Sequence, residues 1–547
     1  MKKQRRAFIF FSIMALLLAG CAKSSEEMNA YYLNSSSGND LNDGLTPETA
    51  WKSLAKINDA HLEPGMKVLL AEGSRFEGKL VITGSGTTNE PIIVSSYSAV
   101  DDGNSANPVI DAKGYLTAIY LNNASNIQIE NLELTSDAGE PFEEQAKTLR
   151  YGVLIEAENA GFHPNIKLSN LHIHHIFATE NVEKDGQNPT SNLGYGIFIR
   201  MKNNEARIKN VTIENCKIEM TGHTGIRAFG SVKNDERSYL DSLTIVNNVL
   251  ENIGGPGMVP GLCKHVLVRG NVTNYTGSDA DPRMHNRGSG IWPWTSENVL
   301  IEKNKFMNAW GKMDSYGAHI DYNCKNVVVQ YNLSVNNSGG FVEILGNDHN
   351  CCYRYNVSIN DGYRQKGVKG VVHDGKVLWT SGYVGKAPRK GPFNSYIYNN
   401  TIFVKEEYDT RFSFAKTTDG ILIANNIFYI MGKSIDVNDN EAVNSGSGTI
   451  QNVVFMNNLY QRGGIIPESV IIQDAQPFFG DPQFKNPGGL NAEDYIPDNI
   501  DLIKDKGITI EPIPGDPIGL SIGLDVEYDY FGNKIDGLPD LGAIQCK

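Results

Sequence analysis

Asp321 and Glu343 are the two residues of this sequence whose types and spacing best suit acid–base chemistry. They lie in GAHIDY (317–322) and GFVEIL (340–345) and are 22 residues apart. If a repeating structure returns after about that many residues, the two carboxylates occupy the same offset on adjacent turns, about 4.8 Å apart at Cβ. Carboxylates that close repel each other, so one pKa should rise. A protonated acid beside an ionised carboxylate is what the cleavage of a glycosidic bond requires.

Several alternatives stay open for this pair. A carboxyl separation near ~5 Å would imply retention of configuration and one of ~6.5–9.5 Å inversion, and the sequence does not choose between them. One of the two carboxylates could instead order a turn or hold Ca²⁺. Asp314, which precedes the strand of Asp321, is a third candidate carboxylate.

Two polar residues near this pair are expected to bind substrate. His319 lies two residues before Asp321 on the same strand and face, where it could contact substrate hydroxyls or tune Asp321, although a surface or packing role explains a lone histidine equally well. Asp374, in GVVHDG (370–375), is expected at the analogous offset one coil beyond Glu343.

Aromatic and cationic residues complete the expected binding face. Trp292 and Trp294 precede Asp321 by about one coil, and a flat indole can stack on the apolar face of a sugar ring. Arg200 and Arg227 could pair with uronic-acid or sulfate groups. The purely structural alternatives are packed loop contacts for the tryptophans and an ion pair with Glu156 for Arg200.

These residues lie between the copies of a recurring β-rich phrase that ends in Asn. Its copies are NIQIENLEL (126–134), NIKLSNLHI (165–173), NVTIENCKI (210–218), SLTIVNNVL (242–250), HVLVRGNVT (265–273), NVLIEKNKF (298–306), NVVVQYNLS (326–334), NCCYRYNVS (350–358), NSYIYNNTI (394–402), GILIANNIF (420–428) and NVVFMNNLY (452–460). Repeats of this size built from strands predict a solenoid in which each coil buries its face on its neighbours. The shared asparagines are expected to stack and to hydrogen-bond along the stack and to turn backbone, which is a structural role. They are Asn131, Asn170, Asn215, Asn248, Asn271, Asn304, Asn332, Asn356, Asn400, Asn426 and Asn458.

A second recurring strand begins with Gly and has alternating faces. Small or apolar residues at odd offsets from the Gly are expected to face the core, and those at even offsets to face outward. An outward row that contains aromatic, His, Asp and Glu residues is typical of a binding face rather than of an ordinary solvated one. The outward pairs are Leu154/Glu156, Phe198/Arg200, Arg227/Phe229, Trp292/Trp294, His319/Asp321 and Phe341/Glu343.

The chain resembles right-handed parallel β-helix proteins, a group that includes polysaccharide lyases and glycoside hydrolases. The resemblance rests on PETAWKSLAK (47–56), on PGMKVLL (64–70), on the repeats and on the tail DYFGNKIDGLPDLGAIQ (529–545). It implies an all-β, single-stranded right-handed parallel β-helix with an N-terminal cap that carries a short helix, and an irregular C-terminal closing segment. We expect the cap and first coils over 31–110, the β-helix with a catalytic groove over 111–460, and the C-terminal cap over 461–547.

DSYGAHIDYN (314–323) and GGFVEILGN (339–347) resemble the Asp-then-Glu arrangement on consecutive coils of glycoside hydrolase families 120 and 141. The resemblance implies hydrolysis of xylosyl- or fucosyl-type linkages in plant or algal glycans. Carried over, Asp321 is the nucleophile or base and Glu343 is the general acid.

Two other functions stay open. A polysaccharide lyase acts by β-elimination on a uronate and needs a neutralising Ca²⁺ or Arg and a base. Arg200, Arg227, Lys312 and Lys369 favour this alternative, and Ca²⁺ is an expected cofactor only in that case; a hydrolase of this kind requires none. A non-catalytic glycan-binding protein would need only the aromatic row. Glu343→Gln should abolish turnover by a hydrolase and leave a binder unaffected.

The first residues predict a processing segment. MKKQRR is basic, AFIFFSIMALLLAG is apolar, and Cys21 follows at once. LLAG-Cys resembles the lipobox of bacterial lipoproteins, which implies a signal peptide over 1–20, lipidation of Cys21 and a tether over 21–30. An ordinary signal peptide is the alternative. We therefore expect a monomer, anchored by lipid at the outer membrane or cell surface.

Composition and cysteine spacing limit the other partners. The net charge is −14 and no basic stripe is present, so nucleic-acid binding is not expected. Six further cysteines contain no CxxC pair, so a metal cluster is not expected either. For the four within or beside the repeats, Cys216, Cys324, Cys351 and Cys352, buried thiols are the simplest interpretation.

Overall fold

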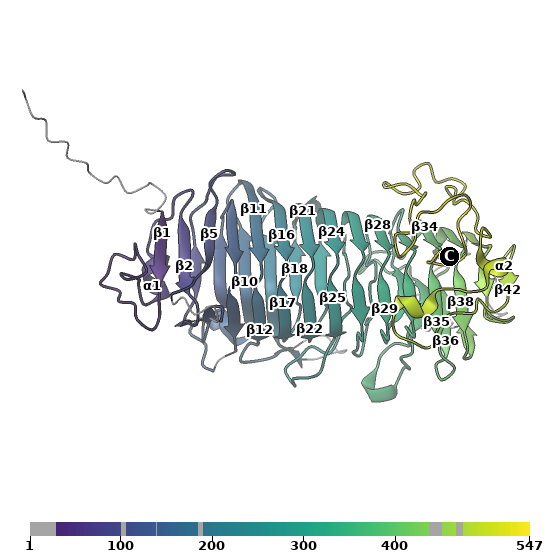
Figure 1. The fold of residues 1–547 in the computed structure, drawn as a ribbon, viewed down its shortest axis with the longest axis horizontal. Helices are drawn as coiled ribbons and strands as arrows, with labels where there is room; N and C mark the ends of the chain where they lie inside the picture. Colours follow the sequence, from purple (N-terminus) through teal and green to yellow (C-terminus); the bar gives the residue numbers. More distant parts are fainter. Residues whose placement is uncertain are drawn as a thin grey trace, which may run out of the picture.

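The computed structural model describes residues 29–99, 106–137, 139–183, 190–436, 451–466 and 474–546, and they form an elongated all-β rod (Figure 1). Two sheets of 14 strands each run the whole length of the described rod. Within each sheet the strands follow in sequence order, and each pairs in parallel with the equivalent strand one coil away. The chain is therefore a parallel β-solenoid, as its repeats predict. The right-handed winding stays a prediction.

The first sheet contains the strands that precede the recurring Asn. Its members are β1 (Ala30–Leu33), β2 (Lys67–Ala71), β5 (Ile92–Tyr97), β8 (Ile127–Glu130), β11 (Gly161–Ser169), β16 (Ala206–Glu214), β21 (Leu240–Val246), β24 (Cys263–Arg269), β26 (Glu297–Glu302), β28 (Lys325–Gln330), β31 (Cys352–Arg354), β34 (Phe393–Tyr398), β37 (Asp419–Ala424) and β40 (Gln451–Met456).

The second sheet contains the strands that follow the recurring Asn. Its members are β3 (Arg75–Glu77), β6 (Val109–Asp111), β9 (Glu133–Ser136), β12 (His172–Ile176), β17 (Lys217–Thr221), β22 (Val249–Ile253), β25 (Val272–Thr276), β27 (Lys305–Met307), β29 (Leu333–Val335), β32 (Val357–Ile359), β35 (Thr401–Val404), β38 (Ile427–Ile430), β41 (Leu459–Tyr460) and β42 (Phe478–Phe479).

The third face of the rod carries the strands introduced by Gly, and it is interrupted. A six-stranded sheet ends at β23 and a four-stranded sheet begins at β30, and among the described residues only isolated bridges at Ile291, Trp294, Tyr316, Ala318 and Ile320 lie between them. Pro293 lies in this gap, and a proline cannot donate a hydrogen bond to a ladder. The strands of this face are β4 (Leu80–Ile82), β7 (Thr117–Asn122), β10 (Leu149–Ala157), β15 (Leu193–Met201), β18 (Ile226–Phe229), β23 (Met258–Gly261), β30 (Gly340–Ile344), β33 (Lys376–Thr380), β36 (Thr410–Phe414) and β39 (Ser434–Asp436).

The recurring Gly packs against the Gly of the next coil. A Cβ on Gly196 would lie 2.6 Å from the carbonyl oxygen of Gly225, and one on Gly225 would lie 2.7 Å from that of Gly257. Only a residue without Cβ allows the backbones to approach this closely. The Ile and Val side chains that follow then fill a continuous core between the three faces.

The predicted asparagine stack is present, but it begins at Asn248 rather than at Asn131. From Asn248 to Asn458, the Nδ2 of each asparagine donates to the Oδ1 of the next at 2.9–3.0 Å, and the series ends at Asp474. Asn131, Asn170 and Asn215 instead occupy the corner one residue earlier, with φ of 52–57°. They were predicted to join the same stack, but they lie outside it: Asn170 Nδ2 donates to Asn131 Oδ1 at 3.2 Å in a separate, shorter one. Asparagine is tolerated at this corner because it adopts the left-handed region readily.

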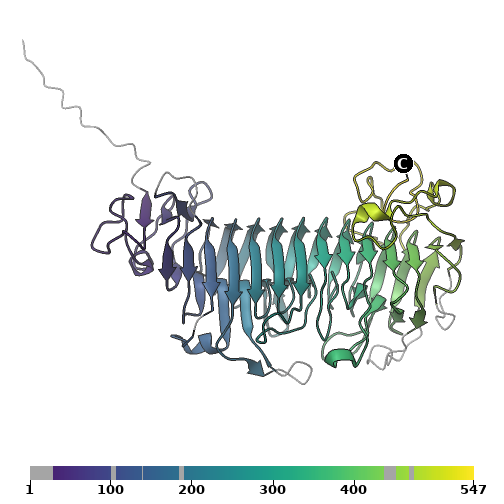
Figure 2. The ribbon, with the colours of Figure 1, turned by 60° about the horizontal axis from the view of Figure 1, so that its bottom comes forward.

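The two ends of the rod differ. The predicted short helix near the N-terminal end is α1 (Leu54–Asn58), which buries Leu54 and Ile57. At the other end β42 continues the second sheet, and the chain then turns back so that its last part covers the outer side of the green strands in Figures 1 and 2. The remaining elements are hairpins β13 (Val182–Glu183) with β14 (Thr190–Ser191) and β19 (Ser231–Lys233) with β20 (Glu236–Ser238), helix α2 (Ile500–Ile503), and 3-10 turns η1 (Glu144–Lys147), η2 (Val368–Gly370) and η3 (Ala492–Tyr495).

Two further sequence predictions concern the thiols and the anchor. Cys216, Cys324, Cys351 and Cys352 are buried free thiols, in agreement with the sequence interpretation, and Cys263 is one as well. Cys21 and the signal segment lie outside the described residues. Within the described part of the chain, no helix has the length and apolar character needed to cross a bilayer.

Candidate functional site

A cavity of about 830 Å³ lies over the interrupted part of the third face. Both predicted catalytic residues, Asp321 and Glu343, line it. So do five of the six residues that were expected to bind substrate: His319, Trp292, Trp294, Arg227 and Asp374. The gap in the sheet thus coincides with the place where these polar side chains gather.

The register between the two catalytic candidates differs from the prediction. Ile320 pairs with Ile344, so Glu343 lies beside His319, and Asp321 lies beside Leu345. The coil is 24 residues long here rather than 22. Because a shift of two residues keeps a side chain on the same face, both carboxylates still face the cavity. Their Cβ separation becomes about 8 Å instead of one strand spacing.

Phe341 was predicted to face outward and instead belongs to the core. It packs with Tyr353 at a ring-centroid distance of 5.8 Å, and its neighbour Val342 is in the core as well. The strict alternation fails because Gly340 has a φ of 152°, a region open almost only to glycine. Glu343 follows this irregularity and points into the cavity.

Asp321 is a carboxyl group whose surroundings favour the protonated form. Burial raises the pKa of Asp321 to about 7, with a further rise from the charge of Asp314 and an opposing effect from the backbone N–H of Tyr322, which donates to it at 2.8 Å. A group with such a pKa holds a proton near neutral pH and can still release it.

Asp314, which the sequence suggested only as a third candidate, has the opposite character. Arg287 Nε donates to its Oδ2 at 2.6 Å. Burial by itself would raise the pKa of Asp314, but the charge and the hydrogen bond of Arg287, together with the nearby His319 and Arg364, outweigh it and hold the pKa at about 2. Asp314 and Ser315 both have positive φ, and backbone strain of this kind clusters at functional sites.

His319 lies between Ser289 of the preceding coil and Glu343 of the following one. Burial lowers the pKa of His319 to about 4, so the ring is neutral at pH 7. Its Nδ1 lies 3.0 Å from Ser289 Oγ and 3.5 Å from Glu343 Oε2. The neutral ring makes the second contact a polar one rather than an ion pair, and the indole of Trp292 lies 5.0 Å away, centroid to centroid.

Aromatic rings form the walls of the cavity. Trp294 stacks on Phe229 at 5.2 Å, and Tyr316 stacks on Trp379 at 6.4 Å. Trp379 is also the residue that pairs with Glu343 one coil further on. Asp374 was expected at that offset; it lies in the preceding loop instead, where it accepts the backbone N–H of Lys366 at 2.8 Å and reaches the cavity from its rim.

Arginine side chains supply positive charge on several sides. Arg227 lies over the ring of Phe229 at 5.0 Å, and three arginines that the sequence reasoning did not single out also line the cavity: Arg287, Arg364 and Arg389. Arg200 does not line it. It forms an ion pair with Glu156, whose carboxylate also accepts the hydroxyl of Tyr120 at 2.8 Å. The ion pair with Glu156, given above as the alternative role for Arg200, is therefore the one that the structure shows.

The missed residues had little signal in the sequence. Arg287 is 27 residues before its partner Asp314, close to one coil, which is the one clue that spacing could have offered. Arg364 and Arg389 come from loops whose paths no periodicity predicts.

Comparisons with known proteins agree on the fold. No protein-family model matches the chain. It is 24% identical, over 626 aligned positions, to a lacto-N-biosidase from Bifidobacterium longum subsp. longum; the match covers 96% of this chain but only 37% of that protein. The chain thus spans little more than a third of this curated relative.

Solved structures show the same architecture. A GH136 lacto-N-biosidase from Eubacterium ramulus matches with a TM-score of 0.55 and 22% identity, over 83% of this chain and 68% of that one. The alginate lyase AlyF-OU02 matches with a TM-score of 0.50 and 14% identity, over 86% of this chain and 92% of that one. At these identities the likeness concerns the fold. The expected link to families 120 and 141 stays a prediction.

Proposed function

We propose that this chain is a glycoside hydrolase that cleaves an oligosaccharide by a two-carboxylate mechanism. One observation carries the proposal: the same aromatic-lined cavity holds Asp321, with a pKa raised to about 7, and Asp314, with a pKa held at about 2. Two carboxyl groups whose pKa values are pushed apart mark the acid and its ionised partner. The similarity to a lacto-N-biosidase supports the same class of reaction.

The pKa values favour a particular division of roles. Asp321 donates its proton to the departing glycosidic oxygen, because it is the protonated group of the site near neutral pH. The carboxylate of Asp314 acts on the anomeric carbon, as nucleophile or through a water. Arg287 keeps it ionised. This assignment reverses the role expected for Asp321 from the family resemblance, and it makes Glu343 a substrate-binding group beside His319.

The proposed substrate is the end of an oligosaccharide. The cavity volume of about 830 Å³ suits one or two sugar rings, and the indoles of Trp292 and Trp294 offer apolar faces for them. An oligosaccharide that carries lacto-N-biose is the first compound to test, since the curated relative is named for that activity. Plant and algal glycans with xylosyl or fucosyl linkages form the second panel.

Substitutions at the three carboxylates test the roles. Asp314→Asn should lower kcat at least about 10³-fold on every substrate, because it removes a charge that acts on the anomeric carbon. Asp321→Asn should lower kcat by about 10²–10⁴-fold on a natural oligosaccharide and far less on an aryl glycoside, whose leaving group needs no proton. Glu343→Gln should mainly raise KM.

The outcomes separate the assignments. If Glu343→Gln removes turnover on both substrates while Asp314→Asn remains active, Glu343 is the partner of Asp321 and the role given to Asp314 is wrong. If no panel member is cleaved by the folded wild-type protein but sugars bind, a glycan-binding function replaces hydrolysis.

A polysaccharide lyase is the second candidate function, and the four arginines around the cavity favour it. Arg227, Arg287, Arg364 and Arg389 could neutralise the carboxylate of a uronate. Lys312 and Lys369, which the sequence offered as bases, are absent from the described cavity lining. Products with an unsaturated, ultraviolet-absorbing ring, released from alginate or another uronate polymer, would establish this function in place of hydrolysis.

We also propose that the chain is anchored by lipid at Cys21 and faces the cell surface. The basic and apolar segment that ends in LLAG-Cys supports this. Mass spectrometry of the N-terminal peptide from the protein produced in a bacterial host should find a diacylated Cys21, and Cys21→Ser should release the protein from the membrane fraction. An unmodified peptide would indicate an ordinary signal peptide.

A further inference from the structure

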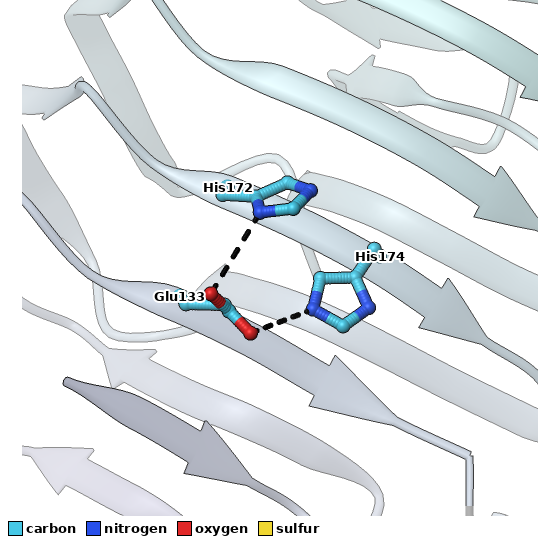
Figure 3. Close-up of side chains that lie close together, drawn as sticks. All are labelled: Glu133, His172 and His174. Atoms are coloured by element: carbon cyan, nitrogen blue, oxygen red, sulfur yellow. Dashed lines mark hydrogen bonds and ion pairs between the residues drawn. The ribbon is translucent and has the colours of Figure 1, made fainter. Parts of the chain in front are cut away.

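Glu133, His172 and His174 lie together on the outer surface of the second sheet, outside the cavity (Figure 3). Glu133 belongs to β9 and pairs in register with His172 of β12, one coil away, and His174 is two residues further along β12. Each of the three residues offers one ligand atom, and all three atoms lie within 4.8 Å of one another. None of these residues lines the cavity.

The distances leave space for an ion between the three side chains. Glu133 Oε1 lies 3.1 Å from His174 Nε2, and Glu133 Oε2 lies 3.8 Å from His172 Nδ1. A tetrahedral Zn²⁺ with bonds of about 2.0–2.2 Å separates its ligand atoms by about 3.4 Å. The two observed separations, each measured from a different oxygen of Glu133, lie on either side of this value.

The other nitrogen of His172 already has a partner. Its Nε2 lies 2.8 Å from Glu219 Oε1 on the next coil, which places a carboxylate behind the ring. If Nε2 carries the proton, Nδ1 presents its lone pair toward Glu133 at a distance too long for a hydrogen bond. Carboxylate–histidine–metal arrangements fix the tautomer of a ligating histidine in this way.

His174 is oriented by a local irregularity of its strand. The register of β12 against β9 shifts between His174 and Ile176, and His175 has a φ of 51°. This bulge brings His175 Nδ1 to 2.9 Å from His174 Nδ1. One of the two nitrogens must donate, so His174 can hold its proton on Nδ1 and offer Nε2 to an ion in place of its present hydrogen bond to Glu133.

We propose that Glu133, His172 and His174 form a binding site for Zn²⁺ that links two neighbouring coils. Two imidazoles and one carboxylate are a ligand set that zinc accepts, with a water in the fourth position. The site is open to solvent on one side, since the side chains are 28%, 35% and 19% exposed. Glu219, which also pairs with Lys217 at 2.9 Å, orients His172 without touching the ion.

Calorimetric titration of the purified full chain, freed of metal by a chelator, tests the site with ZnCl₂. The wild type should bind one equivalent more than His174→Ala or Glu133→Gln. Glu219→Gln should keep this equivalent with an affinity about 10–100-fold weaker. His265→Ala is the matched control and should bind like the wild type, because His265 contacts a single carboxylate, Asp241, on a different sheet.

Thermal unfolding provides a second measurement. Zn²⁺ should raise the Tm of the wild type and of His265→Ala but not that of Glu133→Gln, a substitution that preserves shape and therefore folding. Excess Ca²⁺ should not displace the ion, since imidazole ligands disfavour it. Equal zinc isotherms for the wild type, Glu133→Gln and His174→Ala, or displacement by Ca²⁺, would show that the cluster is only a ladder of hydrogen bonds and ion pairs.

Discussion

At the level of single residues, the cavity gives two aspartates opposite properties through their neighbours. Asp314 has a guanidinium in contact, whereas Asp321 accepts a backbone N–H, is raised in pKa by the negative charge of Asp314, and feels the charge of Arg287 only as a smaller opposing effect. The difference arises from burial and charge, because the two side chains are chemically the same.

The pH dependence of turnover follows from these pKa values. A general acid must be protonated, so kcat/KM on a natural oligosaccharide should be level between about pH 4 and 6 and fall tenfold per pH unit above about 7. Asp314, with a pKa of about 2, adds no limb in the range where the protein can be assayed. Steady-state rates from pH 4 to 9 measure this.

A substitution separates Asp321 from other titrating groups. The alkaline limb should vanish in the residual activity of Asp321→Asn. If the activity of the wild type instead rises through pH 7, Asp321 acts as an ionised base or nucleophile, as the family resemblance first suggested.

At the level of elements, β30 depends on one glycine. Gly340 has a φ of 152°, and a Cβ there would lie 1.9 Å from the carbonyl oxygen of Lys376 on the next coil. Gly340→Ala should therefore cost about 2 kcal/mol or more and displace Glu343. Urea unfolding and activity measure the two effects. Gly463→Ala, where no atom lies within 4 Å of the added Cβ, is the control and should change neither.

The asparagine ladder stabilises the corner between the first two sheets. Asn332 donates to Asn356 and to the carbonyl oxygen of Ile301, and it accepts from Asn304. Asn332→Ala should cost about 3 kcal/mol, because it leaves several buried partners without hydrogen bonds.

Chemical denaturation measures this cost. The control is Asn274→Ala, which removes a half-buried amide that donates to Glu251 and accepts from Asn308 outside this ladder. A cost below 1 kcal/mol for both variants would contradict a stabilising ladder.

At the level of the whole molecule, the last part of the chain covers coils that lie more than a hundred residues earlier. Asp516 accepts hydrogen bonds from Asn350 at 3.0 and 3.1 Å and from the hydroxyl of Tyr396. Apolar residues around Ile513 pack on the outer side of β31 and β34. The segment thus shields a sheet face that would otherwise expose large aromatic side chains.

Asp516→Ala should loosen this cover. The buried partners lose their acceptor, and the segment after residue 505 should become open to limited proteolysis while the repeats stay intact. Cleavage sites found by mass spectrometry provide the measurement. Asp525→Ala, at an exposed position of the same segment, should be cut like the wild type, and equal resistance of both variants would contradict the proposed role of Asp516.

Much of the fold could be predicted from the sequence because its signals are local and periodic. The alternation of Ile and Val, the glycine that introduces many strands of the third face and the asparagine near most corners recur from coil to coil. Parallel pairing of equal phrases follows from such repeats. Part of the candidate site followed as well, since Asp321, Glu343 and Trp292 lie in those phrases.

Only the tertiary structure decided the register and the partners within the site. Coil length changes through turns and loops, so a two-residue error placed Glu343 beside Asp321 rather than beside His319. Arg287, which separates the pKa of Asp314 from that of Asp321, acts across coils on a scale of a few ångströms. Periodicity determines which face a side chain occupies, but proton affinity depends on contacts that no repeat encodes.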